Sequence, residues 1–364
     1  MMFESTSEKI KKGISIALRC VGKNITLPTL EYVLLIINKN TLTIRATNLS
    51  IGTEVIIAIK SDSSETLAIR GDILFSFLSN IINDEKIVCE KRGELFIIKT
   101  KNSTATLKTF PYDDFPTLPR IESEEKNTLP VTTFVDGIKA VLFSASLSES
   151  KPEISSVYIY KEENNLVFVS TDSFRLAEKK IILKKTISFN PIIIPQKNAI
   201  ELVKIFENQN GDVLVNTSEN QCSFECGGVY ITTRLISGIF PDYAQIIPKQ
   251  EETSIIVLRQ DLLSSLKLSN TFSDKLNQAE FEVSDKQFIV SAKNSDVGEQ
   301  VSNVDATVEG KPITVVVNQK YISDVFQSIS SDSISLSFFG TQKPIIFRGI
   351  SDSSFMYLVM PMNR

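Results

Sequence analysis

The fold is decided by residues 67–119, LAIRGDILFSFLSNIINDEKIVCEKRGELFIIKTKNSTATLKTFPYDDFPTLP. This stretch reads as a short strand, a polar helix start, an amphipathic helix and then alternating strands. The same order of signals returns in residues 192–248 and 313–362. The helical apolar positions are Ile73, Leu74, Phe77 and Leu78; Ile200, Leu202, Val203 and Phe206; and Ile322, Val325, Phe326 and Ile329. The sequence therefore predicts one unit built three times.

The segments before these stretches also match one another. Residues 5–22, 131–146 and 258–273 each predict a helix, and each is followed by a predicted hairpin. The hairpin turns carry Asn48, Asp172 and Asn294, which are spaced about 120 residues apart, a domain-sized period.

We place the three domains at residues 1–124, 125–250 and 251–364. Strands outnumber helices within each copy and adjoin one another in sequence. This order is typical of an α+β fold with mostly antiparallel sheets and two helices packed on one face.

The composition excludes several classes of site. The 364 residues contain no histidine, which removes Ser-His-Asp and Cys-His catalysis and every His-ligated metal. No glycine-rich nucleotide loop occurs, so we expect no cofactor. The net charge of −4 still leaves room for a local basic surface. Without a long apolar run or a secretion signal, the expected location is cytoplasmic, away from membranes.

The four cysteines, Cys20, Cys89, Cys222 and Cys226, are too few and too scattered for a disulfide framework. Cys222 and Cys226 share one face of a predicted strand, and we interpret them as small buried residues. A zinc site is the alternative, although no second pair has metal-ligand spacing.

Lysines mark the polar sides of the predicted helices, and we expect them on all six. The residues concerned are Lys9, Lys11, Lys12, Lys139, Lys197, Lys204, Lys267, Lys275 and Lys320. A solvated helix face explains any single lysine. Together they favour a lining for a polyanion, provided that the three sheets join edge to edge and the helices share one face.

Four motifs carry a resemblance that covers the whole chain. They are TLPTLEYVLL (26–35), STDSFRLA (170–177), FPDYAQIIPK (240–249) and YLVMPMNR (357–364). The chain resembles the bacterial sliding clamps, the beta subunits of DNA polymerase III. The resemblance implies a non-enzymatic, head-to-tail homodimeric ring around duplex DNA. It also implies partners: the polymerase alpha subunit, a clamp loader and other proteins with a clamp-binding motif.

In this family, partner peptides enter a cleft between the second and third domains. Carried over by position, its residues here are Ile154, Thr171, Ser173, Phe174, Arg175, Leu176, Pro241, Ile246, Leu358, Met360, Pro361 and Met362, with Tyr321 and Pro344 at a second lobe. Two positions depart from the family pattern. Ser173 stands where glycine is usual, and serine tolerates a positive φ poorly. Phe174 replaces a histidine or tyrosine.

The resemblance also points to DNA-facing and dimer residues. Lys23, Asn24 and Lys197 would face DNA. Leu107, on an outer edge strand of the first domain, would meet the third domain near Phe272 of a second copy. Phe272 could equally be a core residue.

The alternative from another class is a nuclease that binds magnesium through Asp113, Asp114 and Asp172. All three aspartates lie in predicted turns, where aspartate is common for structural reasons.

Overall fold

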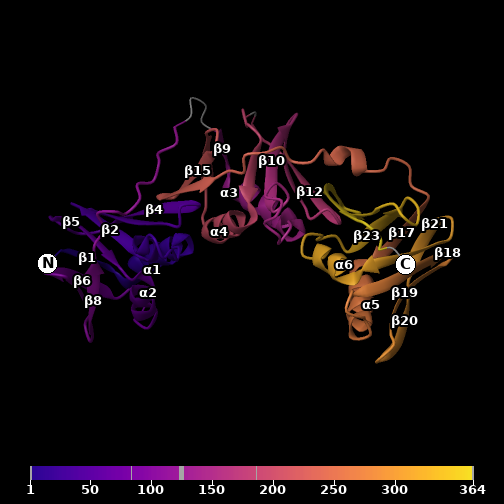
Figure 1. Cartoon of the computed structure of the whole chain (residues 1–364), viewed down its shortest axis with the longest axis horizontal. Coiled ribbons are helices and arrows are strands. Elements are labelled where there is room, and N and C mark those ends of the chain that lie inside the picture. The colour runs from indigo at the N-terminus through magenta and orange to yellow at the C-terminus, as the bar shows by residue number, and fades with distance from the viewer. Residues whose placement is uncertain (1, 83, 123–126, 186, 363–364) are drawn as a thin grey trace. The chain divides into compact units, whose positions relative to one another are not determined.

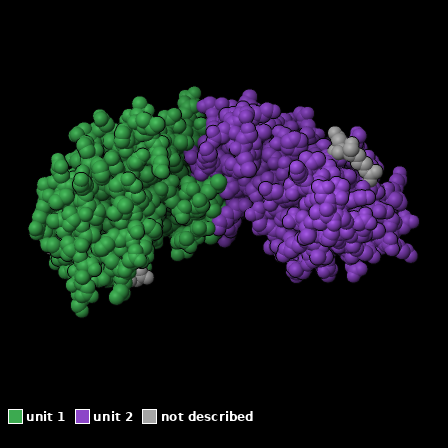
Figure 2. Space-filling view, turned by 60° about the horizontal axis from the view of Figure 1, so that its bottom comes forward, with its two compact units in different colours: residues 1–135, 200–235 green, residues 136–199, 236–364 purple. Residues whose placement is uncertain are grey.

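The computed structural model describes residues 2–82, 84–122, 127–185 and 187–362 (Figure 1). The chain forms two compact units, coloured separately in Figure 2. Unit 1 contains Met1–Val135 and Ile200–Leu235, and unit 2 contains Asp136–Ala199 and Ile236–Arg364. The predicted boundary between residues 124 and 125 lies outside the described residues. None of the described helices has the length and apolar character that crossing a bilayer requires.

Unit 1 is built on one sheet of twelve antiparallel strands. In spatial order they are β1 (Phe3–Thr6), β6 (Lys86–Arg92), β7 (Leu95–Lys99), β8 (Thr104–Phe110), β5 (Ser64–Ile69), β2 (Val33–Asn38), β3 (Thr41–Thr47), β4 (Ile51–Ala58), β16 (Val229–Arg234), β15 (Gln221–Cys226), β14 (Asp212–Thr217) and β9 (Asn127–Pro130). Strand β4 of the first repeat pairs with β16 of the second, with Ile51 opposite Thr233. We call this pairing the first joint.

Unit 2 contains a nine-stranded and a four-stranded sheet. The larger runs β13 (Ile192–Pro195), β10 (Ser156–Glu162), β11 (Asn165–Thr171), β12 (Arg175–Ile182), β25 (Asp352–Val359), β24 (Ile345–Gly349), β23 (Ser333–Phe338), β17 (Thr253–Leu258) and β21 (Ala306–Gly310). The smaller runs β20 (Gly298–Val304), β19 (Gln287–Asn294), β18 (Gln278–Ser284) and β22 (Ile313–Asn318). Strand β12 of the second repeat pairs with β25 of the third, with Arg175 opposite Val359. We call this pairing the second joint.

Two α-helices belong to each repeat, as predicted. They are α1 (Ser7–Ala17) and α2 (Gly71–Ser79), α3 (Val131–Val141) and α4 (Gln196–Phe206), and α5 (Arg259–Thr271) and α6 (Gln319–Val325). Asn318 caps α6 as expected, because its side-chain oxygen accepts the N–H groups of Lys320 and Tyr321.

The predicted length of α6 is wrong. The helix ends at Val325, so Phe326 and Ile329 lie beyond it, although both side chains are buried. The following run of serines competes for backbone hydrogen bonds and favours turns over helix.

A small residue sits at the same position of the first helix of every repeat. A side chain on Gly13 would begin 2.5 Å from Cδ1 of Ile57, and one on Gly137 would begin 2.3 Å from Cε2 of Phe168. The third repeat has Ser265 at this position, and it is also buried. Each repeat therefore brings its first helix close to its sheet through the same sequence device.

All four cysteines are free and buried, and the burial predicted for Cys222 and Cys226 is confirmed. Burial raises the pKa of the Cys20, Cys89 and Cys222 thiols, so these sulfurs stay protonated and unreactive near neutral pH.

Candidate partner-peptide site

The turn between β11 and β12 is held by its own side chains. The Thr171 hydroxyl accepts the Ser173 N–H at 3.1 Å and donates to the Arg175 carbonyl at 2.7 Å. A carboxylate oxygen of Asp172 accepts the N–H groups of Phe174 and Arg175 at 2.9 and 3.0 Å. Aspartate suits this role because its short acceptor reaches the backbone two residues on.

The departure at Ser173 leaves the turn intact. Ser173 has φ +79°, the left-handed conformation that glycine adopts at little cost. A residue with a Cβ pays roughly 1–2 kcal/mol there. The turn therefore keeps a glycine-like backbone, and it leaves the Phe174 side chain 61% exposed.

Arg175 ties this turn to the third repeat. Its Nη1 donates to Oδ2 of Asp324 at 2.6 Å, and its Nε donates to Oδ2 of Asp172 at 3.0 Å. The guanidinium also lies 4.4 Å from the ring centroid of Tyr321. Burial alone would lower the pKa of Arg175, but the Asp324 hydrogen bond and the other nearby groups raise the pKa overall. The group therefore stays charged although it is buried.

The end of β25 completes the arrangement. The Met360 N–H donates to the Phe174 carbonyl at 2.8 Å, and the Met362 N–H donates to the Val316 carbonyl at 2.7 Å. The segment after β25 thus runs from the Asp172 turn to the edge of β22, with its three described residues half-buried. Asn363 and Arg364 of the YLVMPMNR motif lie outside the described residues.

The FPDY motif covers the apolar side of the second joint. Leu176 and Leu358 are each 1% exposed and belong to a buried cluster with Phe240 and Tyr243. The Tyr243 hydroxyl donates to Glu178 at 2.5 Å and is 2.8 Å from the Tyr160 hydroxyl. Burial, then the nearby Glu178 charge, raises the pKa of Tyr243 well above its ordinary value.

The predicted cleft residues therefore separate into two groups. Those that form the buried base are Ile154, Thr171, Arg175, Leu176, Pro344 and Leu358, and those that a ligand can reach are Ser173, Phe174, Pro241, Ile246, Tyr321, Met360, Pro361 and Met362. All of them lie in unit 2. Sequence reasoning missed Asp324 and Glu178, because no local sequence pattern indicates that they contact Arg175 and Tyr243.

The residues predicted to face DNA differ in their exposure and in their partners within the chain. Lys23 is exposed. The Asn24 side chain is used by its own loop, since its oxygen accepts the N–H groups of Thr26 and Leu27. Lys197 is exposed and lies 2.5 Å from a carboxylate oxygen of Glu149, whose pKa is lowered first by the Lys197 hydrogen bond.

The expectation of a lysine on all six helices is wrong. Helix α2 contains none, and Lys275 lies after the end of α5 at Thr271. The other lysines on the predicted helices do lie within α1, α3, α4, α5 and α6.

The two residues predicted at the dimer contact differ in how far they are buried. Strand β8 is not an outer strand along its whole length, because Thr109 and Phe110 pair with β5. Leu107 pairs with Phe96 of β7 and is 7% exposed, so its side chain is buried within the single chain. Phe272 directly follows α5 and is half-buried.

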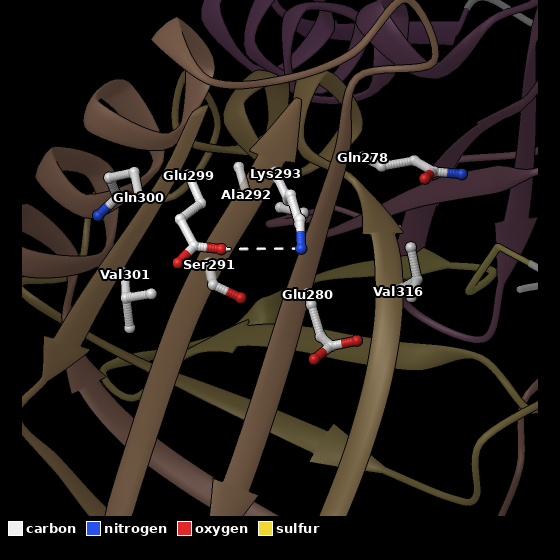
Figure 3. Close-up of a pocket in the computed structure, with 10 residues that line it drawn as sticks. Gln278, Glu280, Ser291, Ala292, Lys293, Glu299, Gln300, Val301 and Val316 are labelled. Carbon is white, nitrogen blue, oxygen red and sulfur yellow. Dashed lines mark ion pairs between the residues drawn. The ribbon is translucent and has the colours of Figure 1, made fainter. Parts of the chain in front are cut away.

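A hollow on the four-stranded sheet of unit 2 has a different character (Figure 3). Its volume is about 270 Å³, and its polar lining comes from β18, β19 and β20. Lys293 faces Glu299 across neighbouring strands, with 3.9 Å between their charged atoms. With Glu280, Lys293 and Glu299 in its lining, this charged hollow does not suit an apolar peptide anchor.

The two metal alternatives lack a ligand set. Within the described residues, no group of three or more Cys, Asp or Glu side chains could hold a metal ion. The oxygens of Asp172 are taken by its own turn and by Arg175.

Comparisons with known proteins cover the whole chain. Residues 1–119, 128–242 and 244–363 match the N-terminal, central and C-terminal domains of the DNA polymerase III beta subunit family. The beta sliding clamp of Buchnera aphidicola is 27% identical over all of both chains, and that of Synechococcus elongatus is 23% identical over 97% of each. The solved beta subunit of Thermotoga maritima superposes with a TM-score of 0.94 at 22% identity, covering 100% of this chain and 99% of that one. A Pseudomonas aeruginosa sliding clamp solved with griselimycin gives 0.94 at 20% identity over the same shares. The chain belongs to the DNA polymerase III beta subunit family and is built from three DNA-clamp domains.

Proposed function

We propose that this chain is a DNA sliding clamp, an accessory subunit that encircles duplex DNA and tethers the replicative polymerase without chemistry of its own. The observation that carries the proposal is the match of all three repeats to successive domains of one clamp subunit. A closed ring slides because phosphate contacts are interchangeable along the duplex. Tethering raises the effective concentration of polymerase at the primer end.

The ring would be a head-to-tail homodimer, because a closed ring needs a second copy of a three-domain chain. Two surfaces support this arrangement. Residues 104–108 of β8 pair with β7 on one side and have no strand partner on the other among the described residues. In the third domain, the end of α5, the loop after it and the β19–β20 hairpin expose Leu268, Leu276, Val297 and Val301. We assign the dimer contact to these surfaces, with Leu107 supporting β8 from inside.

The helices and the loops beside them would line the opening of the ring, through which duplex DNA passes. Lys23 and Lys197 are our candidates for phosphate contacts, and Asn24 shapes the loop that carries Lys23. The pairing of Lys197 with Glu149 does not conflict with this role. Both side chains are more than 60% exposed, and an exposed pair is weak enough for a phosphate to displace the carboxylate.

Partner peptides would bind at the second joint, over Ser173, Phe174, Pro241, Ile246, Tyr321 and residues 360–362, with Arg175, Leu176 and Leu358 beneath. Flexible methionines suit a surface that receives several different peptides. The partners would be the polymerase III alpha subunit, a clamp loader and other proteins with a clamp-binding motif, all in the cytoplasm.

The test of the ring uses a nicked circular plasmid and a clamp loader with ATP. We expect the loaded protein to stay on the circle during gel filtration and to leave when a restriction enzyme linearises the DNA. Equal loss from the circular and linear forms would contradict the topological mechanism.

The test of the peptide site removes residues 360–364. We expect this deletion to abolish binding of an alpha-subunit peptide while the dimer persists in sedimentation. An unchanged peptide affinity would exclude the assigned site and leave the ring untouched.

A further inference from the structure

The Asp172 turn has a structural twin in the first repeat. The Thr47 hydroxyl accepts the Leu49 N–H at 3.0 Å and donates to the Ile51 carbonyl at 3.1 Å. The Asn48 side-chain oxygen accepts the N–H groups of Ser50 and Ile51, both at 2.9 Å. Leu49 has φ +72°, close to the value at Ser173.

The neighbouring strand end is repeated too. The Arg234 N–H donates to the Ser50 carbonyl at 2.9 Å, as the Met360 N–H does to Phe174 at the second joint. Gly52 stands opposite Thr232, just as Leu176 stands opposite Leu358. Unit 1 therefore reproduces the backbone of the proposed peptide site with different side chains.

A cavity of about 140 Å³ lies at this place, and we call it the first-joint pocket. It is lined by Thr47, Leu49, Ser50, Ile51, Gly52, Pro116, Thr117, Leu118, Pro119, Gln221, Thr232, Thr233 and Arg234, all in unit 1. A cavity of about 150 Å³ accommodates one benzene-sized group, so this one has room for a single apolar side chain.

The lining combines an apolar base with one cation. Leu118 reaches over Gly52, where any Cβ would stand 2.3 Å from its Cδ2, and Leu49 is 40% exposed at the mouth. Arg234 is the single charged residue in this lining. It is exposed, and no carboxylate pairs with it within the part of the chain that the structure describes.

We propose that the first-joint pocket binds a short extended segment of a partner protein that carries a leucine-sized side chain beside a carboxylate. The side chain enters between Leu49 and Leu118, and the carboxylate pairs with Arg234. Gln221 and Thr232 add an amide and a hydroxyl for the peptide backbone. Each protomer would then offer two peptide positions with one backbone design and different selectivity, which goes beyond the clamp function proposed above.

The test uses the full chain with labelled leucine methyl groups and N-acetyl-Leu-Asp-amide as the probe, followed by NMR. We expect shifts at the Leu49 and Leu118 methyls that saturate with the probe. The uncharged N-acetyl-Leu-Asn-amide should bind about two- to fivefold more weakly, because the lost ion pair involves an exposed arginine and such pairs are weak.

Arg234→Gln should reduce binding of the Asp probe to the level of the Asn probe. Arg92→Gln is the matched control, since Arg92 is also in unit 1, carries the same charge and lies outside the lining. The proposal would be overturned if the Leu49 and Leu118 methyl signals did not shift when the probe is added. It would also be overturned if the Arg234→Gln variant bound the Asp probe as tightly as the unaltered chain does.

Failure here is distinguishable from failure of the clamp function. Leu176 and Leu358 methyls report the second joint separately, and retention on circular DNA reports the ring. Shifts at Leu358 alone would refute the first-joint pocket and leave the peptide site of the second joint standing.

Discussion

The two joints share a backbone and differ in what their side chains do. At the second joint, Arg175 makes two ion pairs and Leu176 fills the base. At the first joint, the matching residues are Ile51, which is 2% exposed, and Gly52. The comparison teaches that the repeat supplies the same strand-to-strand pairing at both joints, whereas the side chains that could distinguish a ligand are ones that the repeats do not share.

The largest expected effect is at Arg175, which has no charged counterpart at the first joint. Arg175→Ala leaves Asp172 and Asp324 facing each other without a cation. Removing one partner of a largely buried pair costs about 3–5 kcal/mol, and the partial exposure of Asp324 reduces our expectation to about 2–3 kcal/mol.

Urea unfolding followed by a probe in unit 2 measures this cost. Lys343→Ala, which removes a pair that is over one half exposed at both ends, serves as control and should cost below about 1 kcal/mol. Similar costs for the two variants would show that Arg175 does not lock the second joint.

The second prediction makes the first joint resemble the second. Gly52→Leu places its Cβ on Leu118, so overpacking should destabilise unit 1 by about 1–3 kcal/mol. Adding Leu118→Ala should recover much of that loss, because Leu118 then no longer occupies the space. Thermal unfolding of both variants gives the coupling, and purely additive losses would show that the two side chains do not compete.

The third prediction concerns the turn that both joints use. Ser173→Gly relieves the left-handed strain but adds freedom to the unfolded chain, so a net gain of about 0.5 kcal/mol is expected. Leu49→Gly is the matched change at the first joint, and it additionally loses a half-exposed apolar side chain. A loss of stability in Ser173→Gly would mean that the serine is held by contacts beyond its own turn.

The smallest expected effect is a loss of stability from Tyr243 that appears only in alkali. Glu54 at the first joint and Glu178 at the second occupy corresponding positions, two residues after Gly52 and Leu176. Glu54 binds Arg45 and Arg120, whereas Glu178 binds Tyr243. Burial raises the folded pKa of Tyr243 above its unfolded value of about 10. The unfolded chain then loses this proton first, so the contribution of Tyr243 is complete below about pH 10 and falls as the pH rises further.

Melting temperatures between pH 8 and 11 measure this dependence. Tyr243→Phe should reduce the alkaline loss without abolishing it, because the buried thiols of Cys20, Cys89 and Cys222 also have raised pKa values. Tyr230→Phe at the first joint serves as the control. An identical alkaline slope in Tyr243→Phe and the unaltered chain would remove Tyr243 as its cause.

The repeats and the helices could be predicted because their signals are local. The turn residues Asn48 and Asp172 and the helical spacing of apolar side chains each act within a few residues. The ion pair between Arg175 and Asp324 could not be predicted in this way, because it joins residues from different domains. Alternation around Leu107 shows which neighbours share its face, but only the folded sheet shows that the Leu107 side chain is buried.

The burial of all four native thiols has a practical consequence for labelling and crosslinking experiments on this protein. A maleimide dye or a crosslinker added to the folded protein would find no accessible sulfur. One cysteine placed on β8 and another beside Phe272 could therefore seal or report the proposed dimer contact without first replacing the native residues. A ring sealed in this way cannot open at that contact, so any slower release from circular DNA than that of the unsealed ring would measure how much release depends on opening there.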